Sequence, residues 1–166
     1  MIIKVLFICL SILSAKLPNE VRWVTNSNEY KVLCNQIYND AWESMQDSLN
    51  KVNNPVIVMD LDETVLDNSK YQIDLYINDE QYNPESWSKW VKKMEASLVP
   101  GSKEFILKFK KIKGSRIIFI SNRMDKNLIP TQNNMKKLDI FFDNDIFLLR
   151  QDKKDKKIVR RKEVFN

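Results

Sequence analysis

The sequence predicts one α/β domain built on a parallel sheet, and three observations support this. Three short runs are wholly apolar, as buried strands usually are: residues 56–59, 117–120 and 146–149. Segments with helical periodicity separate these runs, as the crossovers of a parallel sheet require. The length of 166 residues suits a single core better than two. We therefore expect a parallel sheet flanked by helices.

Composition narrows the chemistry. The chain is 43% hydrophobic and 30% charged, which is typical of a globular protein, and its net charge of +5 favours anionic ligands without indicating nucleic acid. The absence of histidine excludes Ser-His-Asp and Cys-His catalysis and His-ligated zinc. Two glycines, Gly101 and Gly114, cannot build a Gly-rich phosphate loop. Phosphate chemistry would depend on carboxylates, hydroxyls and lysine.

The first element, residues 1–15, has the layout of a secretory signal peptide. Lys4 precedes an apolar run over 5–13, which small residues follow, and the run is too short to span a bilayer comfortably. The alternative is a buried first strand or helix. Bulky residues before Cys9 argue against a lipoprotein. We expect a secreted or periplasmic protein without a stable membrane span after cleavage, and a domain over 16–166.

The next elements alternate between helix and strand. Residues 27–51 have a helical period, with Ser27 as the cap and one apolar stripe: Tyr30, Leu33, Cys34, Ile37, Ala41, Met45 and Leu49. The turn signal Asn53-Asn54-Pro55 introduces the strand over 56–59. Residues 67–83 show no clear period.

Proline, glycine and capping residues mark the ends of the next helices. Pro84 opens a short helix bearing Trp87, Trp90 and Met94, and Ser102 after Pro100-Gly101 caps another helix that ends at Gly114. The strand over 117–120, a helix over 130–138 and the strand over 146–149 follow. Residues 151–163 are dense in lysine and arginine, which usually indicates a solvated helix face.

Polar side chains gather where two strands end. Asp60, Asp62 and Glu63 directly follow the first strand, and Ser121 follows the second. Ligands bind at the carboxyl ends of parallel strands, so these groups should converge. Carboxylates this close repel one another, and a divalent cation with oxygen ligands usually compensates. One carboxylate could then attack phosphorus while a second transfers protons.

These residues resemble the motifs of a known family. Asp60-Leu61-Asp62-Glu63-Thr64-Val65-Leu66-Asp67-Asn68-Ser69, with Tyr71 after it, is similar to the first motif of the haloacid dehalogenase (HAD) superfamily, and more narrowly to its class C (subfamily IIIB) acid phosphatases. Ile117-Ile118-Phe119-Ile120-Ser121-Asn122-Arg123 resembles their second motif. The segments 29–30, 36–39, 87–91 and 99–101 are similar as well, so the resemblance implies a Rossmann-like parallel sheet with a small helical cap or N-terminal helical region.

The resemblance implies a role for each matching position. Asp60 would be the nucleophile and a Mg²⁺ ligand. Asp62 would be the general acid and base, with its main-chain carbonyl on the metal. Ser121 would bind the transferring phosphoryl group, and Lys156 matches the lysine of the third motif. Trp87 would stack on the leaving group. We also expect Asn122 and Arg123 to bind substrate.

Simpler interpretations stay open for several of these residues. Ser121 could cap a turn, and Trp87 and Trp90 could serve core packing alone. Lys156 competes with its neighbours Lys153, Lys154 and Lys157.

The family's fourth motif, Gly-Asp-x-x-x-Asp, supplies a further magnesium carboxylate and is absent from this sequence. The chain therefore resembles a C-terminally truncated member, with an incomplete metal site and one strand fewer in its sheet. We expect a magnesium-dependent acid phosphatase that hydrolyses phosphomonoesters, such as nucleoside monophosphates and aryl phosphates, through an aspartyl-phosphate. The alternatives are a non-catalytic remnant that binds phosphate or protein, and a phosphotransferase. The sequence leaves open whether the protein forms a homo-oligomer.

Overall fold

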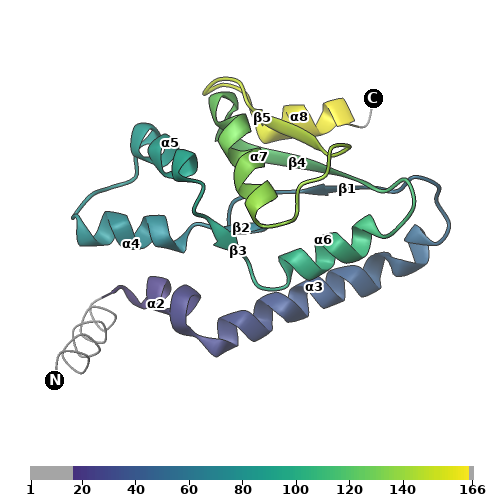
Figure 1. The fold of residues 1–166 in the computed structure, drawn as a ribbon, viewed down its shortest axis with the longest axis horizontal. Coiled ribbons are helices and arrows are strands. Elements are labelled where there is room, and N and C mark those ends of the chain that lie inside the picture. The colour runs from purple at the N-terminus through teal and green to yellow at the C-terminus, as the bar shows by residue number, and fades with distance from the viewer. Residues whose placement is uncertain (1–16, 165–166) are drawn as a thin grey trace.

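The computed structural model describes residues 17–164, and it confirms the α/β fold. Three parallel strands form the main sheet in the order β1-β4-β5: β1 (Val56–Met59), β4 (Arg116–Met124) and β5 (Ile146–Arg150) (Figure 1). Met59 lies opposite Phe119, and Phe119 lies opposite Phe147. The three apolar runs of the sequence lie within these three strands, and β4 extends beyond its predicted end at residue 120 to Met124. In this order β4 is central and is paired with β1 in parallel.

Helices flank the sheet. α6 runs alongside α3, and α8 packs against β4 (Figure 1). A small antiparallel pair joins β2 (Leu66–Asp67) to β3 (Ser97–Leu98). The helices are α2 (Asn19–Asn26), α3 (Asn28–Leu49), α4 (Ser69–Ile77), α5 (Pro84–Lys93), α6 (Ser102–Lys110), α7 (Leu128–Lys137) and α8 (Lys157–Val164), with a 3₁₀ turn η1 (Asp125–Asn127) before α7.

The core lies on one face of the sheet. Ile117 and Phe119 of β4 are fully buried there, in one cluster with Ile106 and Phe109 of α6 and Met135 of α7. Period-2 alternation sends Ser121 to the same face as Phe119. Among the described residues, β1 pairs with β4 alone. The core face therefore continues into the polar end of β4.

Local signals fixed several helix ends as predicted. The Ser27 hydroxyl accepts from the Tyr30 N–H at 3.2 Å, and the Asn83 side chain caps α5, which Pro84 begins. The helix after Gly101 differs from the prediction. Gly101 itself is the N-cap, with φ of 85°, and α6 ends at Lys110 rather than at Gly114. Ser102 is instead buried, and its hydroxyl donates to the Val65 carbonyl.

The packing face of α3 also differs from the predicted stripe. Leu33 and Ile37 are 44% and 56% exposed, although both were placed on the apolar stripe. The residues that pack against the core are Tyr38, Ala41, Trp42, Met45 and Leu49. Tyr38 and Trp42 contact Phe105 of α6, with ring centroids 5.3 and 6.3 Å apart. Two aromatic side chains, left out of the stripe, therefore orient the helix.

Some elements were not predicted at all. α2, α4 and the β2–β3 pair have no counterpart in the expected order of elements. α4 buries only Tyr71 and Leu75 along its length, so its periodicity is too weak to detect. The strands of the β2–β3 pair are two residues each, below the length at which alternation can be recognised.

The predicted signal peptide, residues 1–15, lies outside the described residues. Within residues 17–164, none of the helices has the length and apolar character that crossing a membrane would require.

Tyr38 ties α3 to the loop after β1, and this contact gives a pH prediction. Its hydroxyl donates to the Thr64 carbonyl, and burial raises the pKa of Tyr38 to about 12 from 10.0. The unfolded chain would lose this proton near its ordinary pKa, before the folded protein does. Tyr38 therefore makes the free energy of unfolding fall as pH rises from about 10 to about 12.

Tyr38→Phe should remove that contribution. At neutral pH the variant should lose about 1 kcal/mol of stability with the hydrogen bond. Urea denaturation between pH 7 and 11.5 should then show the gap between wild type and variant narrowing as pH rises. A gap that stays constant over this range would contradict the prediction.

Candidate active site

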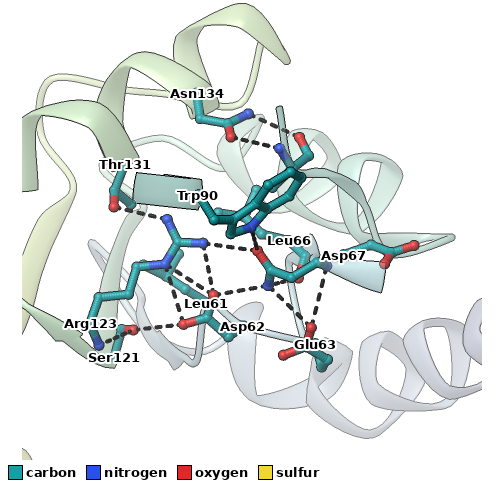
Figure 2. Close-up of polar contacts among 12 residues, drawn as sticks. Leu61, Asp62, Glu63, Leu66, Asp67, Trp90, Ser121, Arg123, Thr131 and Asn134 are labelled. Carbon is teal, nitrogen blue, oxygen red and sulfur yellow. Dashed lines mark hydrogen bonds and ion pairs between the residues drawn. The ribbon is translucent and has the colours of Figure 1, made fainter. Parts of the chain in front are cut away.

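The candidate site lies where the carboxyl ends of β1 and β4 meet. Because the two strands are parallel and in register, Asp60 and Asp62 leave β1 beside Ser121 near the end of β4. A tight turn shapes the loop, since the N–H groups of Val65 and Leu66 both donate to the Leu61 carbonyl at 2.8 Å. The predicted convergence is seen for Asp62 and Ser121, whose side chains are hydrogen-bonded to each other (Figure 2).

Asp60 is the more open of the two aspartates. Its side chain is 39% exposed, and its Oδ1 accepts from the Leu61 N–H at 2.8 Å. Its Oδ2 lies 2.6 Å from the Nζ of Lys157, the first residue of α8. Lys157 and Asp60 line a shallow pocket together with Arg161 and the apolar side chains of Val58 and Ile120. A partly exposed carboxylate thus sits beside two basic side chains that could attract an anion.

Asp62 is held from several sides. The Ser121 hydroxyl donates to its Oδ2 at 3.3 Å, and Arg123 donates to its Oδ1 from Nε at 3.0 Å and from NH2 at 2.8 Å. Arg123 is 1% exposed, and its NH1 donates to the Thr131 hydroxyl at 2.9 Å. Figure 2 shows the guanidinium between Asp62 and Thr131. The buried cation therefore balances the charge of Asp62 and fixes its orientation.

Asn68 supports the same loop from the other side. Its amide nitrogen donates to Asp62 Oδ1 at 3.0 Å and to Glu63 Oε1 at 3.1 Å, and its amide oxygen accepts from Trp90 Nε1 at 2.9 Å. Burial raises the pKa of Glu63, and the neighbouring charge of Asp62 adds to the effect, while bonds from Asn68 oppose it. Asn68 is fully buried, so it holds the two acids of the loop at a fixed spacing.

Lys156 was predicted as the site lysine, and the structure puts a different lysine beside Asp60. Lys156 is exposed and lines a separate cavity with Asp152 and Val159. Lys157 makes the contact with Asp60 instead. Lys157 begins α8 whereas Lys156 precedes the helix, so the two side chains face different surroundings. The run of lysines carried no signal that distinguishes them.

Arg123 was predicted to bind substrate, and its burial corrects that prediction. Its guanidinium is engaged with Asp62, Thr131 and Asn68, so it supports the site from behind rather than facing a ligand. Asn122 is exposed, and its side-chain oxygen lies 3.4 Å from the NH2 of Arg160.

Trp87 is half-buried, which leaves part of its ring accessible. The ring packs edge-on against Tyr71, with centroids 5.1 Å apart, and the Arg123 guanidinium carbon lies 5.7 Å from its centroid. It lies at the margin between core and site. Trp90 is 2% exposed and bonded to Asn68, so for Trp90 the core-packing interpretation holds.

Three residues of the site were missed by sequence reasoning, Asn68, Thr131 and Arg160, and Lys157 was named only as a competitor of Lys156. Asn68 lies inside the first motif, six residues after Asp62, and its type and position were the only available signal. Thr131 and Arg160 reach the site from α7 and α8, so no local pattern connects them to β1.

The donor set for a metal ion is small. Within residues 17–164, no cluster of three or more acidic or cysteine side chains could hold a metal ion. Asp60 offers a partly exposed carboxylate, whereas the Asp62 carboxylate is bonded to Arg123. Mg²⁺ usually keeps several waters and needs only one or two protein carboxylates together with substrate phosphate. The residues present meet that minimum.

Comparisons with known proteins show the family to which the chain belongs. The family model for the HAD superfamily, subfamily IIIB (acid phosphatase), matches residues 10–165. The chain is similar to the class C acid phosphatase from Bacillus anthracis, at 33% identity and a TM-score of 0.78 over 92% of this chain. It is also similar to that phosphatase with tungstate bound, at 34% identity and a TM-score of 0.75 over 87% of this chain. The matches cover 65% and 62% of those chains, so this chain spans somewhat less than two thirds of their length.

Proposed function

Since the chain belongs to subfamily IIIB of the HAD superfamily, the acid phosphatases, we propose that it hydrolyses small-molecule phosphomonoesters. The observation that carries this proposal is the pairing at the strand ends: Asp60 is open and beside Lys157, while Asp62 is held by Ser121 and Arg123. One carboxylate is therefore available for attack, and the other is oriented for proton transfer.

In the proposed reaction, an Asp60 oxygen attacks phosphorus, and the bond from phosphorus to the leaving oxygen breaks. Asp62, entering the step in its protonated form, donates its proton to that oxygen and becomes the carboxylate. Asp62 then takes a proton from water as the water oxygen attacks the aspartyl-phosphate, which releases inorganic phosphate and restores Asp60. The Lys157 ammonium and the Ser121 hydroxyl would stabilise charge on the phosphoryl oxygens. Mg²⁺, held by Asp60 and the Asp62 carbonyl, would supply further positive charge there.

The substrate class and the location follow from weaker observations. A half-buried Trp87 supports a planar leaving group, as in nucleoside monophosphates or aryl phosphates. The apolar run over residues 5–13 supports secretion.

The test is hydrolysis of p-nitrophenyl phosphate at mildly acid pH by the full chain, with Mg²⁺ and with EDTA. We expect turnover that EDTA abolishes and Mg²⁺ restores. Isothermal titration calorimetry with Mg²⁺ alone should show binding that Asp60→Asn weakens. Folded protein that shows no turnover with Mg²⁺ would overturn the enzyme proposal.

A non-catalytic phosphate binder is the second candidate, because Asp60 is the one acidic side chain among the described residues that line the basic pocket, and no cluster of three or more metal-ligating side chains occurs in that part of the chain. Tungstate serves as the probe, since the similar phosphatase binds it. Tungstate binding without turnover would favour this candidate over the enzyme.

The two adjacent lysines of the basic segment give a matched comparison. Lys157→Met should lower kcat/KM for p-nitrophenyl phosphate by about 10²–10³-fold, because a charged donor near the attacked phosphoryl group is lost. Lys156→Met removes the same charge at the adjacent position, which is exposed. The kcat/KM of this variant should stay within about twofold of wild type. Equal losses in the two variants, or a larger loss in Lys156→Met, would contradict the assignment of Lys157.

A further inference from the structure

Among the α8 residues whose burial the structure describes, Arg160 alone is buried, and its side chain reaches the end of β4. It is 4% exposed, although it lies in the most basic segment of the chain. Its NH2 donates to the Ser121 carbonyl at 2.9 Å, and its NH1 donates to a carboxylate oxygen and to the carbonyl of Asp155. A single guanidinium therefore joins the end of β4 to the loop that leads into α8.

That loop has its own internal bonds, which extend the connection. Asp155 Oδ2 accepts from the Gln151 N–H at 2.9 Å, and Asp152 Oδ1 accepts from the N–H groups of Lys154 and Asp155. The pKa of Asp155 is held below its usual range by the Gln151 N–H first and by Arg160 second. Hydrogen bonds within the loop from β5 to α8 therefore converge on Asp155, and Asp155 also accepts hydrogen bonds from Arg160.

Apolar packing does little to orient α8. The helix has eight residues, too few for stability by itself, and its Ile158 and Val159 are 63% and 51% exposed. Lys157 and Arg160 are three residues apart, so they lie on neighbouring positions of one helix face. Whatever holds Arg160 in place therefore also determines where the Lys157 ammonium points.

We infer that Arg160 is a positioning residue: its buried guanidinium holds α8 against Ser121 so that the Lys157 ammonium lies on Asp60. The inference rests on the proposed function insofar as Lys157 acts on the phosphoryl group. It assigns Arg160 no contact with substrate. The fork geometry matters, because two nitrogens must reach two separate partners, and a lysine ammonium cannot span both.

A double-mutant cycle tests the inference on the full chain, with wild type, Lys157→Met, Arg160→Met and the double variant. Arg160→Met should lower kcat/KM for p-nitrophenyl phosphate by about 10–100-fold, short of the loss in Lys157→Met. The double variant should be no worse than Lys157→Met, because Arg160 acts through that lysine. Arg160→Lys should recover only a small part of the loss. Lys162→Gln, which removes a charge from an exposed position of the same helix, should match wild type.

Two outcomes would overturn the inference: losses that multiply in the double variant, or wild-type activity in Arg160→Met. Thermal unfolding followed by circular dichroism ensures that all proteins are folded at the assay temperature. If Arg160→Met does not fold, Arg160→Gln takes its place in the cycle.

Tungstate affinity, measured by calorimetry on the same proteins, separates this inference from the proposed function. If wild type shows no turnover, the enzyme proposal fails. The tungstate affinities of the four proteins in the cycle still test the positioning role of Arg160. Non-additive losses of affinity would then support the positioning role, and additive losses would refute it.

Discussion

Asp60→Asn is expected to lower kcat for p-nitrophenyl phosphate by at least about 10³–10⁴-fold, the largest effect on activity that we predict. An amide of the same shape cannot attack phosphorus, so the aspartyl-phosphate does not form. The fold should survive, because the ion pair between Asp60 and Lys157 is partly exposed on both sides and such pairs stabilise proteins by about 0–1 kcal/mol. Stopped and continuous assays of p-nitrophenol release measure the effect.

Asp139→Asn provides the matched control. Asp139 has a side chain that is 83% exposed, it pairs with Lys103 away from the site, and its φ of 58° suits asparagine. The same chemical change there should leave kcat unchanged. Residual turnover by Asp60→Asn within tenfold of wild type would refute the assignment of Asp60 as nucleophile.

Arg123→Met is expected to produce the largest loss of stability, about 3 kcal/mol in the free energy of unfolding. The substitution keeps an apolar stem of similar length but removes the cation that faces Asp62, whose side chain is 22% exposed. The Asp62 carboxylate and the Thr131 hydroxyl would then each lose a partner. Urea denaturation at pH 7 measures the change, with Lys162→Met as an exposed control.

The double variant Asp62→Asn/Arg123→Met should be more stable than Arg123→Met. Removing the acid as well takes away the uncompensated charge, so part of the loss should be recovered. If Arg123→Met unfolds at the same urea concentration as wild type, the buried pair does not stabilise the fold as described.

The elements of the fold that could be predicted are those with a clear apolar run or helix cap in their own sequence. The three apolar strands and the helices with caps could be recognised from sequence, since a run such as 117–120 and a cap such as Ser27 are local properties. α4 and the β2–β3 pair could not, because they owe their formation to packing against the rest of the chain. The orientation of α3 depended on the contacts of Tyr38 and Trp42 with Phe105, more than sixty residues away.

The site divides in the same way. The sequence by itself determined that Asp60, Asp62 and Ser121 share one edge, because each lies at or shortly after the end of an apolar run and parallel strands bring their carboxyl ends together. Only the tertiary structure decided that Lys157 rather than Lys156 reaches Asp60, and that Arg123 lies behind Asp62. The physical reason is that the lysines of 153–157 are locally equivalent, and only long-range contacts such as that of Arg160 with Ser121 set the rotation of α8.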